Sequence, residues 1–229
     1  MSDYKDFEKK IGVVFKDESK LIQAFTHRSY LNEHRDLDIG HNERLEFLGD
    51  AVLELVVTDF LFNKYKDKPE GELTAFRSAL VNTSSLSASA NELGVNDYLM
   101  LSKGEAKDTG RARLYILANT FEAIIGAIYM DQGYDVAEKF ISKIILHKTE
   151  EMVDNRLWQD AKSRFQEASQ EKENTTPAYK PTKETGPDHD KHFMVGVYLG
   201  GKLIAEGEGK SKQEAEQEAA GNALEKKGW

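Results

Sequence analysis

Acidic side chains recur on one side of a predicted helix in residues 41–56, HNERLEFLGDAVLELV. At about 100° per residue they lie within roughly a quarter of the helix circumference. These acids are Glu43, Glu46, Asp50 and Glu54. The apolar residues of the same stretch lie opposite, namely Leu45, Leu48, Val52, Leu55 and Val56. Such a column is either the solvated face of an amphipathic helix or a set of oxygen ligands for a cation.

Two further features count against a solvated face. Phe47 falls on the acidic side of this helix, and an aromatic ring flanked by carboxylates suggests a pocket on a partner. Later in the chain, NTFEAIIGAIYMD places Asn119 and Glu122 one turn apart on a second helix. Small residues border this second face, namely Ala123, Gly126 and Ala127. Two helices that pack closely through small residues can combine their oxygen donors into a site for a hard cation.

The residue types of this ligand set restrict the metal and its chemistry. Oxygen-only ligands suit Mg²⁺, with Mn²⁺ as a substitute, and the absence of cysteine excludes thiolate ligands, thiol nucleophiles and disulfides. Carboxylates packed together repel one another unless a cation neutralises them. A bound cation lowers the pKa of its water and stabilises charge on a phosphoryl group. The pattern therefore indicates metal-assisted hydrolysis of phosphodiester bonds.

The composition is that of a soluble protein with an uneven distribution of charge. The 229 residues are 39% hydrophobic and 31% charged, with a net charge of −9. Residues 156–229 carry 12 basic and 13 acidic residues, whereas residues 1–155 carry 19 and 27. The acidity thus belongs to the first part, which suggests two domains with different tasks. The sequence has neither a signal peptide nor a membrane-spanning run, so we expect a cytoplasmic protein without a membrane partner.

Periodicity separates a helical part of the chain from a mixed part. Apolar residues three and four apart predict helices over residues 17–33, 43–65, 71–94, 113–133 and 135–153. The mixed part has a helix at 161–172, strands at 178–185 and 191–209 with a turn at Gly200–Gly201, and a last helix after Ser211. Glu214 stands three residues after Ser211, which predicts a capping box.

The expected fold is multidomain. An all-α domain is expected at 1–148, a polar linker at 149–157, and a small α+β domain of order α-β-β-β-α at 158–229.

Four blocks of the chain resemble the ribonuclease III family of double-strand-specific endoribonucleases. Residues 42–53, NERLEFLGDAVL, resemble the family's signature, which is a highly specific motif. Other blocks of the endonuclease domain follow the family's order: THRSY at 26–30, EGELTAFRSALV at 70–81 and LANTFEAIIGAIYMD at 117–131. The C-terminal segment resembles a double-stranded-RNA-binding domain, so the resemblance covers essentially the whole chain.

The resemblance implies roles for particular residues. The metal ligands it implies are Glu46, Asp50, Asn119 and Glu122. Asp50 and Glu122 are expected to be catalytic, and Glu43 and Glu70 match outer acids near the cleft. Phe47 matches an aromatic residue that inserts into the partner subunit of a homodimer, which would explain its position on the acidic side of the helix.

The resemblance also implies an activity. Each subunit of the dimer would cut one strand of double-stranded RNA with Mg²⁺, leaving a 5′-phosphate and a 3′-hydroxyl at a 3′ overhang. Substrates would be precursors of ribosomal RNA and other structured RNA, messenger RNA included.

One position departs from the family, which usually has Asp where this chain has Asn119. Asparagine keeps a carbonyl oxygen that can coordinate a cation or a water, but it lacks the charge. The residue is a natural variation that still supports cleavage, an engineered substitution that traps a substrate complex, or the mark of an inactive enzyme. We favour the first, with reduced metal affinity, because the other acids are all present.

The C-terminal domain offers candidate contacts for A-form RNA, whose minor groove is lined by 2′-hydroxyls. The helix at 161–172 presents polar side chains at helical spacing, namely Ser163, Gln166, Glu167 and Gln170. A solvated polar face is the alternative. The loop TGPDHDK resembles the family's loop that enters the next minor groove, with His189 at the contacting position.

Lysines at the start of the last helix are candidate phosphate contacts. Lys210 and Lys212 stand at its N-terminus, where free N–H groups and the helix dipole also favour an anion. The family often has a third lysine where this chain has Gln213, so we expect weaker phosphate binding than is typical. Such local basic groups allow a chain of net charge −9 to bind RNA.

The prediction is a homodimeric, metal-dependent endoribonuclease that acts on double-stranded RNA. One alternative is a non-cleaving double-stranded-RNA-binding protein, which Asn119 supports and which the intact acids Glu46, Asp50 and Glu122 oppose. A second alternative is an acidic helical scaffold without a role in RNA, which residues 156–229 oppose.

Overall fold

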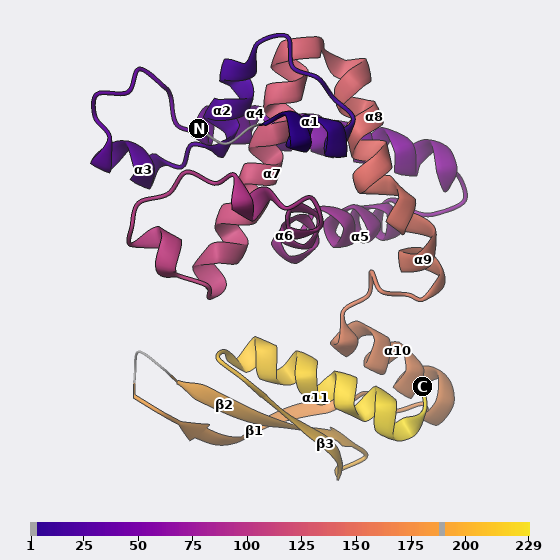
Figure 1. Cartoon of the computed structure of the whole chain (residues 1–229). Helices are drawn as coiled ribbons and strands as arrows, with labels where there is room; N and C mark the ends of the chain where they lie inside the picture. Colours follow the sequence, from indigo (N-terminus) through magenta and orange to yellow (C-terminus); the bar gives the residue numbers. More distant parts are fainter. Residues whose placement is uncertain (1–3, 188–190) are drawn as a thin grey trace. The chain divides into compact units, whose positions relative to one another are not determined.

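The chain folds into two compact units (Figure 1). The structure, a computed structural model, describes residues 4–187 and 191–229. Unit 1 is Met1–Trp158 and unit 2 is Gln159–Trp229. Unit 1 is helical and unit 2 has the element order α-β-β-β-α, so the predicted fold class is confirmed.

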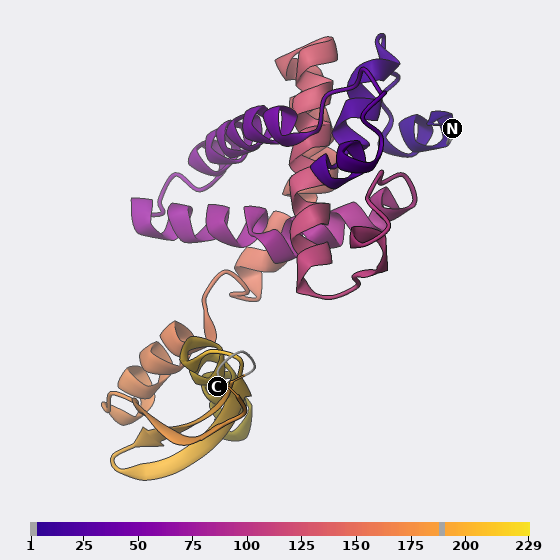
Figure 2. The same ribbon diagram turned by 90° about the vertical axis from the view of Figure 1, so that its left-hand side faces the viewer.

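Unit 1 is built around one central helix. Its α-helices are α1 (Lys5–Ile11), α2 (Glu18–Phe25), α3 (Arg28–Glu33), α4 (Glu43–Lys64), α5 (Glu70–Val81), α6 (Thr83–Glu92), α7 (Arg111–Gln132), α8 (Tyr134–Ile144) and α9 (Thr149–Asp154). Its 3₁₀ turns are η1 (Val95–Asp97), η2 (Glu105–Lys107) and η3 (Leu146–Lys148). The central helix is α7, which packs against α2, α4, α6 and α8 (Figures 1 and 2).

Helix α7 is buried because its sequence is apolar on nearly every side. Phe121, Ile124 and Ile128 are fully buried, whereas Asn119 and Glu122 keep part of their surface exposed. Asn119 and Glu122 are therefore polar positions at the edge of an otherwise buried central part of the helix. No helix among the described residues, α7 included, is long and apolar enough to cross a membrane.

Three of the predicted helices are interrupted in the structure. The first breaks at His27, whose extended backbone begins α3 and whose ring accepts a hydrogen bond from the N–H of Ser29 at 3.3 Å. The third breaks at Asn82, which caps α6 by accepting a hydrogen bond from the N–H of Ser85 at 2.9 Å. The fifth divides into α8, η3 and α9. Capping side chains thus end helices that apolar spacing alone would continue.

Residues 149–157, predicted as a linker, contain α9. Met152 of this helix is buried in the core of unit 1. The boundary between the units follows Trp158, whose ring lies against Phe76 with 4.9 Å between ring centres. Most of the segment therefore packs as part of unit 1, because its apolar side chains find partners on that unit.

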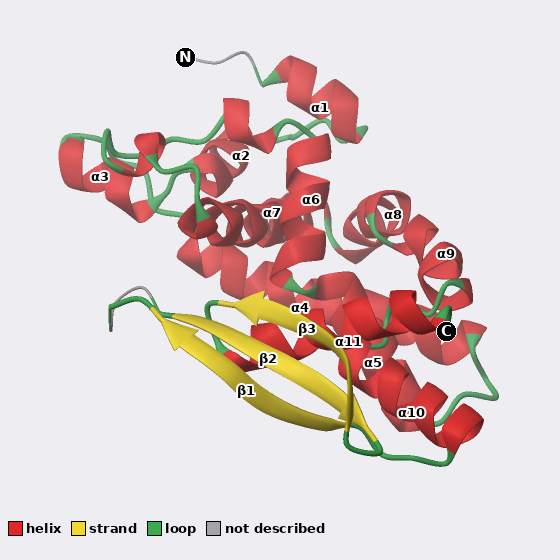
Figure 3. Ribbon diagram, turned by 90° about the horizontal axis from the view of Figure 1, so that it is seen from below, coloured by secondary structure: helices red, strands yellow, loops and turns green. Residues whose placement is uncertain are grey.

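Unit 2 contains an antiparallel sheet of order β1-β2-β3 (Figure 3). Its elements are α10 (Ala161–Glu173), β1 (Ala178–Thr185), β2 (His192–Leu199), β3 (Lys202–Gly209) and α11 (Lys212–Lys227). The predicted turn between β2 and β3 is present, and Gly200 and Gly201 have the positive φ angles of 56° and 83° that a tight hairpin turn requires. Helix α11 covers β2 and β3, and α10 packs against α11.

Small residues bring α11 close to the sheet. Ala215, Ala219 and Ala220 are fully buried. A Cβ atom at Gly207 of β3 would lie 2.2 Å from the backbone nitrogen of Ala219, so only glycine allows this approach. The contact holds the first turns of α11, which Ser211 caps, in a fixed position on the sheet.

Candidate functional site

Helices α4 and α7 cross at two glycines. A Cβ atom at Gly49 would lie 1.8 Å from the carbonyl oxygen of Glu122, and one at Gly126 would lie 2.1 Å from the carbonyl oxygen of Leu45. Any side chain at either position would force the two backbones apart. The close helix approach predicted for the small residues of α7 is therefore present, and Gly49 is its counterpart on α4.

This crossing brings the polar side chains of the two helices together. The pKa of Glu122 is raised to about 7, most of all by burial and further by the negative charges of Asp50 and Glu46. Burial also raises the pKa of Glu46, and Glu43 adds to this effect, whereas a hydrogen bond from the Asn119 amide opposes it. The predicted ligand positions on α4 and α7 therefore share one electrostatic environment.

The donor set of this cluster fits a hard divalent cation. It consists of three carboxylates and one carboxamide, which are the oxygen ligands that Mg²⁺ and Mn²⁺ prefer. Burial contributes most to the raised pKa of Glu122, and repulsion from Asp50 and Glu46 adds to it; a cation would relieve this repulsion. Within residues 4–187 and 191–229, no three His, Cys, Asp or Glu side chains converge into a preformed metal cage. Side-chain rotation would have to complete the coordination of an ion.

Two other acids of the α4 column have basic partners. Glu43 lies 3.8 Å from Arg28 and 3.7 Å from His41, at the outer end of the column. Glu54 lies 3.7 Å from Arg77 of α5. Glu54 is thus paired away from the carboxylates near Glu122, whereas Glu43 still contributes to the raised pKa of Glu46.

An exposed apolar stripe runs along α4. Phe47, Leu55 and Phe62 are 81%, 57% and 69% exposed, and their spacing places them on one side of the helix. Leu55 was predicted to lie with Leu45 and Val52 on the buried side, and this prediction is wrong. The periodicity allowed either side for Leu55, and the packing of unit 1 leaves it in solvent. Large exposed apolar side chains on one side of a helix favour an interaction surface there.

A cavity of about 440 Å³ lies next to this stripe, between α4 and α5. Phe62, Leu61 and Leu73 contribute its apolar lining. Glu70 also lines it and accepts a hydrogen bond from the hydroxyl of Thr74 at 3.0 Å. The predicted outer acid Glu70 is thus part of this cavity.

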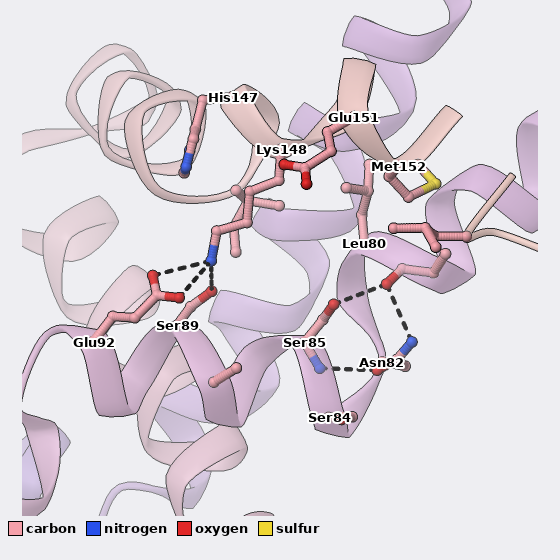
Figure 4. Close-up of a pocket in the computed structure, with 14 residues that line it drawn as sticks. Leu80, Asn82, Ser84, Ser85, Ser89, Glu92, His147, Lys148, Glu151 and Met152 are labelled. Carbon is pink, nitrogen blue, oxygen red and sulfur yellow. Dashed lines mark hydrogen bonds and ion pairs between the residues drawn. The ribbon is translucent and has the colours of Figure 1, made fainter. Parts of the chain in front are cut away.

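A second cavity, of about 590 Å³, lies between α6 and the segment η3–α9 (Figure 4). Its central cation, Lys148, lies 3.0 Å from a carboxylate oxygen of Glu92 and 3.3 Å from the hydroxyl of Ser89. None of the residues that line it belongs to the predicted site.

The side chains predicted to contact RNA are exposed along α10. They are Ser163, Gln166, Glu167 and Gln170. The hydroxyl of Ser163 donates to Asp160 at 2.7 Å, and the amide of Gln159 donates to the carboxylate of Glu167 at 3.0 Å. The neighbouring polar side chains thus hold Ser163 and Glu167 in place. The predicted contact His189 lies outside the described residues.

Lys210 and Lys212 are exposed on either side of the residue that caps α11. This residue, Ser211, accepts a hydrogen bond from the N–H of Glu214 at 3.1 Å. The carboxylate of Glu214 accepts in turn from the N–H of Lys210 at 2.9 Å, one residue before the usual partner in a capping box. The ammonium of Lys212 lies 5.8 Å from the centre of the Phe193 ring. Both lysines therefore stand at a well-defined helix N-terminus.

Comparison with known proteins identifies the family. Residues 17–149 match the model of a family described as Ribonuclease-III-like. Ribonuclease 3 of Streptococcus gordonii is 46% identical over 217 residues, which are 95% of this chain and 93% of that protein. The chain belongs to the ribonuclease III family of endoribonucleases. Ribonuclease 3 of Enterococcus faecalis is 46% identical over 219 residues, 96% of this chain and 95% of that protein, so the relationship extends over both units.

Each of the two units of this ribonuclease III family member matches a known module. Residues 161–227 match a family described as Double-stranded RNA binding motif. A solved nuclease domain of ribonuclease III from Campylobacter jejuni, described as flexible in a region involved in dimer formation, aligns with a TM-score of 0.56 and 39% identity. The alignment covers 62% of this chain and 98% of that domain. The family predicted from the sequence is therefore confirmed.

Two structural features of the site were not singled out from the sequence. Gly49 lies inside the signature, and its role is to allow the close approach of α7, which is a tertiary contact. Phe62 continues the exposed stripe of α4 beyond Phe47. A search for apolar residues on the acidic side of α4, rather than on its core side, would have indicated Phe62.

Proposed function

We propose that the chain is a metal-dependent endoribonuclease that cuts double-stranded RNA as a homodimer, with Asn119 in place of the usual aspartate. The observation that carries this proposal is the close crossing of α4 and α7, where burial and the neighbouring carboxylates Asp50 and Glu46 raise the pKa of Glu122. The products would carry 5′-phosphate and 3′-hydroxyl ends. Membership of the family supports a role in the cytoplasm, in processing ribosomal and other structured RNA.

Glu46, Asp50, Asn119 and Glu122 would hold Mg²⁺, with Mn²⁺ as a substitute. The bound ion supplies a more acidic water and neutralises charge on the phosphoryl group. The amide of Asn119 donates to Glu46, which leaves its carbonyl oxygen available to a cation or a water. Asn119 can therefore contribute an oxygen ligand without the charge of aspartate.

Glu122 is the acid of this set whose pKa its surroundings raise most. With a pKa raised to about 7, this carboxyl is partly protonated at neutral pH unless a cation is near. A protonated carboxyl is a poor ligand, so cation binding and loss of the Glu122 proton are coupled. Asp50 and Glu122 are the residues that we assign to catalysis.

The dimer would form through the stripe on α4. Phe47 is too exposed for a core residue, and an aromatic side chain of its size gains about 2–3 kcal/mol when buried in an apolar site. The cavity of about 440 Å³ between α4 and α5 offers such a site on a second copy. We assign Phe47 of one protomer to this cavity of its partner, with Glu70 at the cavity wall.

Unit 2 would bind the duplex by its shape. The exposed polar side chains of α10 suit the 2′-hydroxyls of a minor groove, and Lys210 and Lys212 suit phosphates. The match to a double-stranded RNA binding motif supports this assignment.

Asn119 is also the observation that favours the second candidate, a protein that binds double-stranded RNA without cutting it. Asparagine lacks the negative charge of the usual aspartate, so it attracts a cation less. A site that binds its cation too weakly would bind RNA and not cut it. The cleavage assay below distinguishes the two functions.

The test is incubation of the purified chain with an end-labelled RNA duplex, in Mg²⁺, in Mn²⁺ and in chelator. We expect cuts in the duplex only with a cation, products with 5′-phosphate ends, and no cuts in single-stranded RNA or in a DNA duplex. Binding in a gel-shift assay without cutting in either cation would support the non-cleaving protein. Equal cutting in chelator would overturn the metal assignment.

A further inference from the structure

A domain that binds A-form RNA has to hold two contact surfaces at a fixed separation. One surface contacts 2′-hydroxyls in a minor groove and the other contacts phosphates across the neighbouring major groove. In unit 2 these surfaces belong to different helices, since the polar side chains lie on α10 and the lysines stand at the start of α11. What fixes α10 against α11 therefore fixes the spacing of the two sets of contacts.

One side chain bridges the two helices with both of its polar atoms. The Nε2 of Gln217, on α11, donates to Oδ1 of Asp160 at 2.8 Å. The Oε1 of Gln217 accepts from the backbone N–H of Lys162, in the first turn of α10, at 3.2 Å. A carboxamide can donate from its nitrogen and accept at its oxygen at the same time, which lets one side chain of α11 hold two groups at the start of α10.

The partner of Gln217 also organises the start of α10. Asp160 is the N-cap of α10 and accepts from the N–H of Ser163 at 3.0 Å and from the hydroxyl of Ser163 at 2.7 Å. Burial alone would raise the pKa of Asp160, but the hydrogen bonds from Gln217 and Ser163 lower it. The same carboxylate thus ends the helix, orients Ser163 and receives the bridge from α11.

Further contacts join the two helices at both ends of α10. Beside Gln217, the ammonium of Lys162 lies 2.6 Å from Glu216 and 5.0 Å from the ring centre of Tyr179. At the other end, Lys227 pairs with Glu173. The far end of α10 is therefore held independently of Gln217, and the Lys162–Glu216 pair remains at its start, so loss of the bridge would loosen the first turn of α10 without detaching the helix.

We propose that Gln217 is a positioning residue for the recognition of double-stranded RNA, because it holds the start of α10 at the spacing from α11 that the duplex requires. This inference rests on the proposed function, in which α10 and the start of α11 contact RNA. Gln217 acts through Asp160, Lys162 and Ser163 and does not itself touch the nucleic acid.

Loss of the Gln217 bridge should change RNA binding in a way that a general loss of stability would not. Contacts of α10 to 2′-hydroxyls are non-ionic, whereas those of Lys210 and Lys212 release counterions and determine the salt dependence of binding. Release of the start of α10 should therefore weaken RNA binding without changing the slope of affinity against salt. It should also reduce the preference for an RNA duplex over a DNA duplex, since only RNA has the 2′-hydroxyl.

The experiment compares the full-length wild-type chain with Gln217→Ala. Binding to an RNA duplex and to a DNA duplex of the same sequence is measured in chelator, at several salt concentrations and well below the melting temperature. We expect RNA affinity to fall about tenfold, which corresponds to one to two hydrogen bonds, with an unchanged salt slope and a smaller preference for RNA. Glu225→Gln, an exposed change near the far end of α11, serves as the control and should leave affinity and slope unchanged.

A second variant covers the case in which Gln217→Ala does not fold. Gln217→Glu keeps the acceptor for the N–H of Lys162 but sets a carboxylate against Asp160, so it should lower RNA affinity in the same way. A lower melting temperature with unchanged RNA affinity in the folded variant would overturn the proposal, as would a loss of affinity that follows a reduced salt slope. Wild-type chain that does not bind duplex RNA would overturn the proposed function itself.

Discussion

The α-carbon of Gly49 lies against the carbonyl oxygen of Glu122, so closely that a methyl group at Gly49 would come within 1.8 Å of that oxygen. The reciprocal contact, of Gly126 with the carbonyl oxygen of Leu45, has a corresponding distance of 2.1 Å. Backbone atoms cannot move aside as a flexible side chain can. The two glycines therefore determine how near the carboxylates of α4 come to those of α7.

Substitution of Gly126 by Ala should separate α4 from α7. The added methyl group meets the backbone of Leu45, so we expect unfolding free energy to fall by about 3 kcal/mol and cleavage to fall further than stability explains. Thermal melting and single-turnover cleavage at a temperature where the variant is folded measure the two effects. Gly71→Ala, on α5 with nothing within 4 Å of the new methyl group, is the matched control. It should stabilise the chain by about 0.5 kcal/mol; equal activity in the two variants would contradict this account of the crossing.

Truncation of Phe47 should weaken the dimer. Phe47→Ala removes about 2 kcal/mol of apolar burial from each of the two symmetric contacts, about 4 kcal/mol in all, so the dissociation constant should rise on the order of a thousandfold. Sedimentation velocity across a range of protein concentrations measures this change. Val14, which is 73% exposed and lies outside α4, provides the control variant Val14→Ala. A Phe47→Ala chain that dimerises as well as Val14→Ala would remove the stripe on α4 from the interface.

The raised pKa of Glu122 predicts how stability depends on pH in metal-free protein. From its ordinary value of 4.5 to about 7, the folded chain retains a proton that the unfolded chain has released. The stability from this proton is fully present below pH 4.5 and is lost as pH rises through about 7. Glu122→Gln lacks this loss, so it should gain on the order of 1 kcal/mol over wild type at pH 8 compared with pH 4.5, a value reduced for the partial exposure of the group.

Urea denaturation in chelator at the two pH values measures this difference. Addition of Mg²⁺ at pH 8 should stabilise wild type and not Glu122→Gln, because the cation replaces the proton as the partner of the carboxylate. A difference between the two chains that stays constant from pH 4.5 to pH 8 would contradict the assigned environment of Glu122.

Restoration of the family's aspartate tests the role of Asn119. Asn119→Asp adds a charge to the ligand set, so the Mg²⁺ concentration for half-maximal cleavage should fall by about tenfold. The same change replaces the hydrogen bond to Glu46 by repulsion, so the metal-free chain should melt at a lower temperature. Cleavage rates in a Mg²⁺ titration and melting in chelator measure the two effects. Identical titrations for the two chains would place residue 119 outside the metal site.

Much of the fold follows from local patterns. Alternation of apolar residues and a Gly-Gly turn predicted β2 and β3, because a hairpin requires only neighbouring residues and positive φ angles at its turn. The ends of α2 and α5 could not be predicted from apolar spacing, since His27 and Asn82 act there as caps. Their side chains compete for backbone N–H groups within runs whose apolar pattern continues.

The candidate site shows a different limit. The residue types of Glu46, Asp50 and Glu122 indicated chemistry, but only the tertiary structure shows that burial and the neighbouring carboxylates raise the pKa of Glu46 and Glu122. Glu54 belongs to the same column but pairs with Arg77 of another helix. The spacing of residues within one helix cannot predict a contact between two helices. Leu55 was misplaced for a similar reason, because burial depends on which neighbouring helix covers a side and not on the apolar residue itself.

We propose that the acids of one helical column differ in function: those near Glu122 act in catalysis, and Glu54 acts only as a surface partner of Arg77. Single-turnover cleavage of an RNA duplex in Mg²⁺ by wild type, Glu122→Gln and Glu54→Gln tests it most directly, with duplex binding in chelator as the reference. We predict that Glu122→Gln binds the duplex as wild type does and cuts it at least about a hundredfold more slowly, while Glu54→Gln cuts within about twofold of wild type. Equal rates for the two variants, or cleavage by Glu122→Gln at the wild-type rate, would contradict the account.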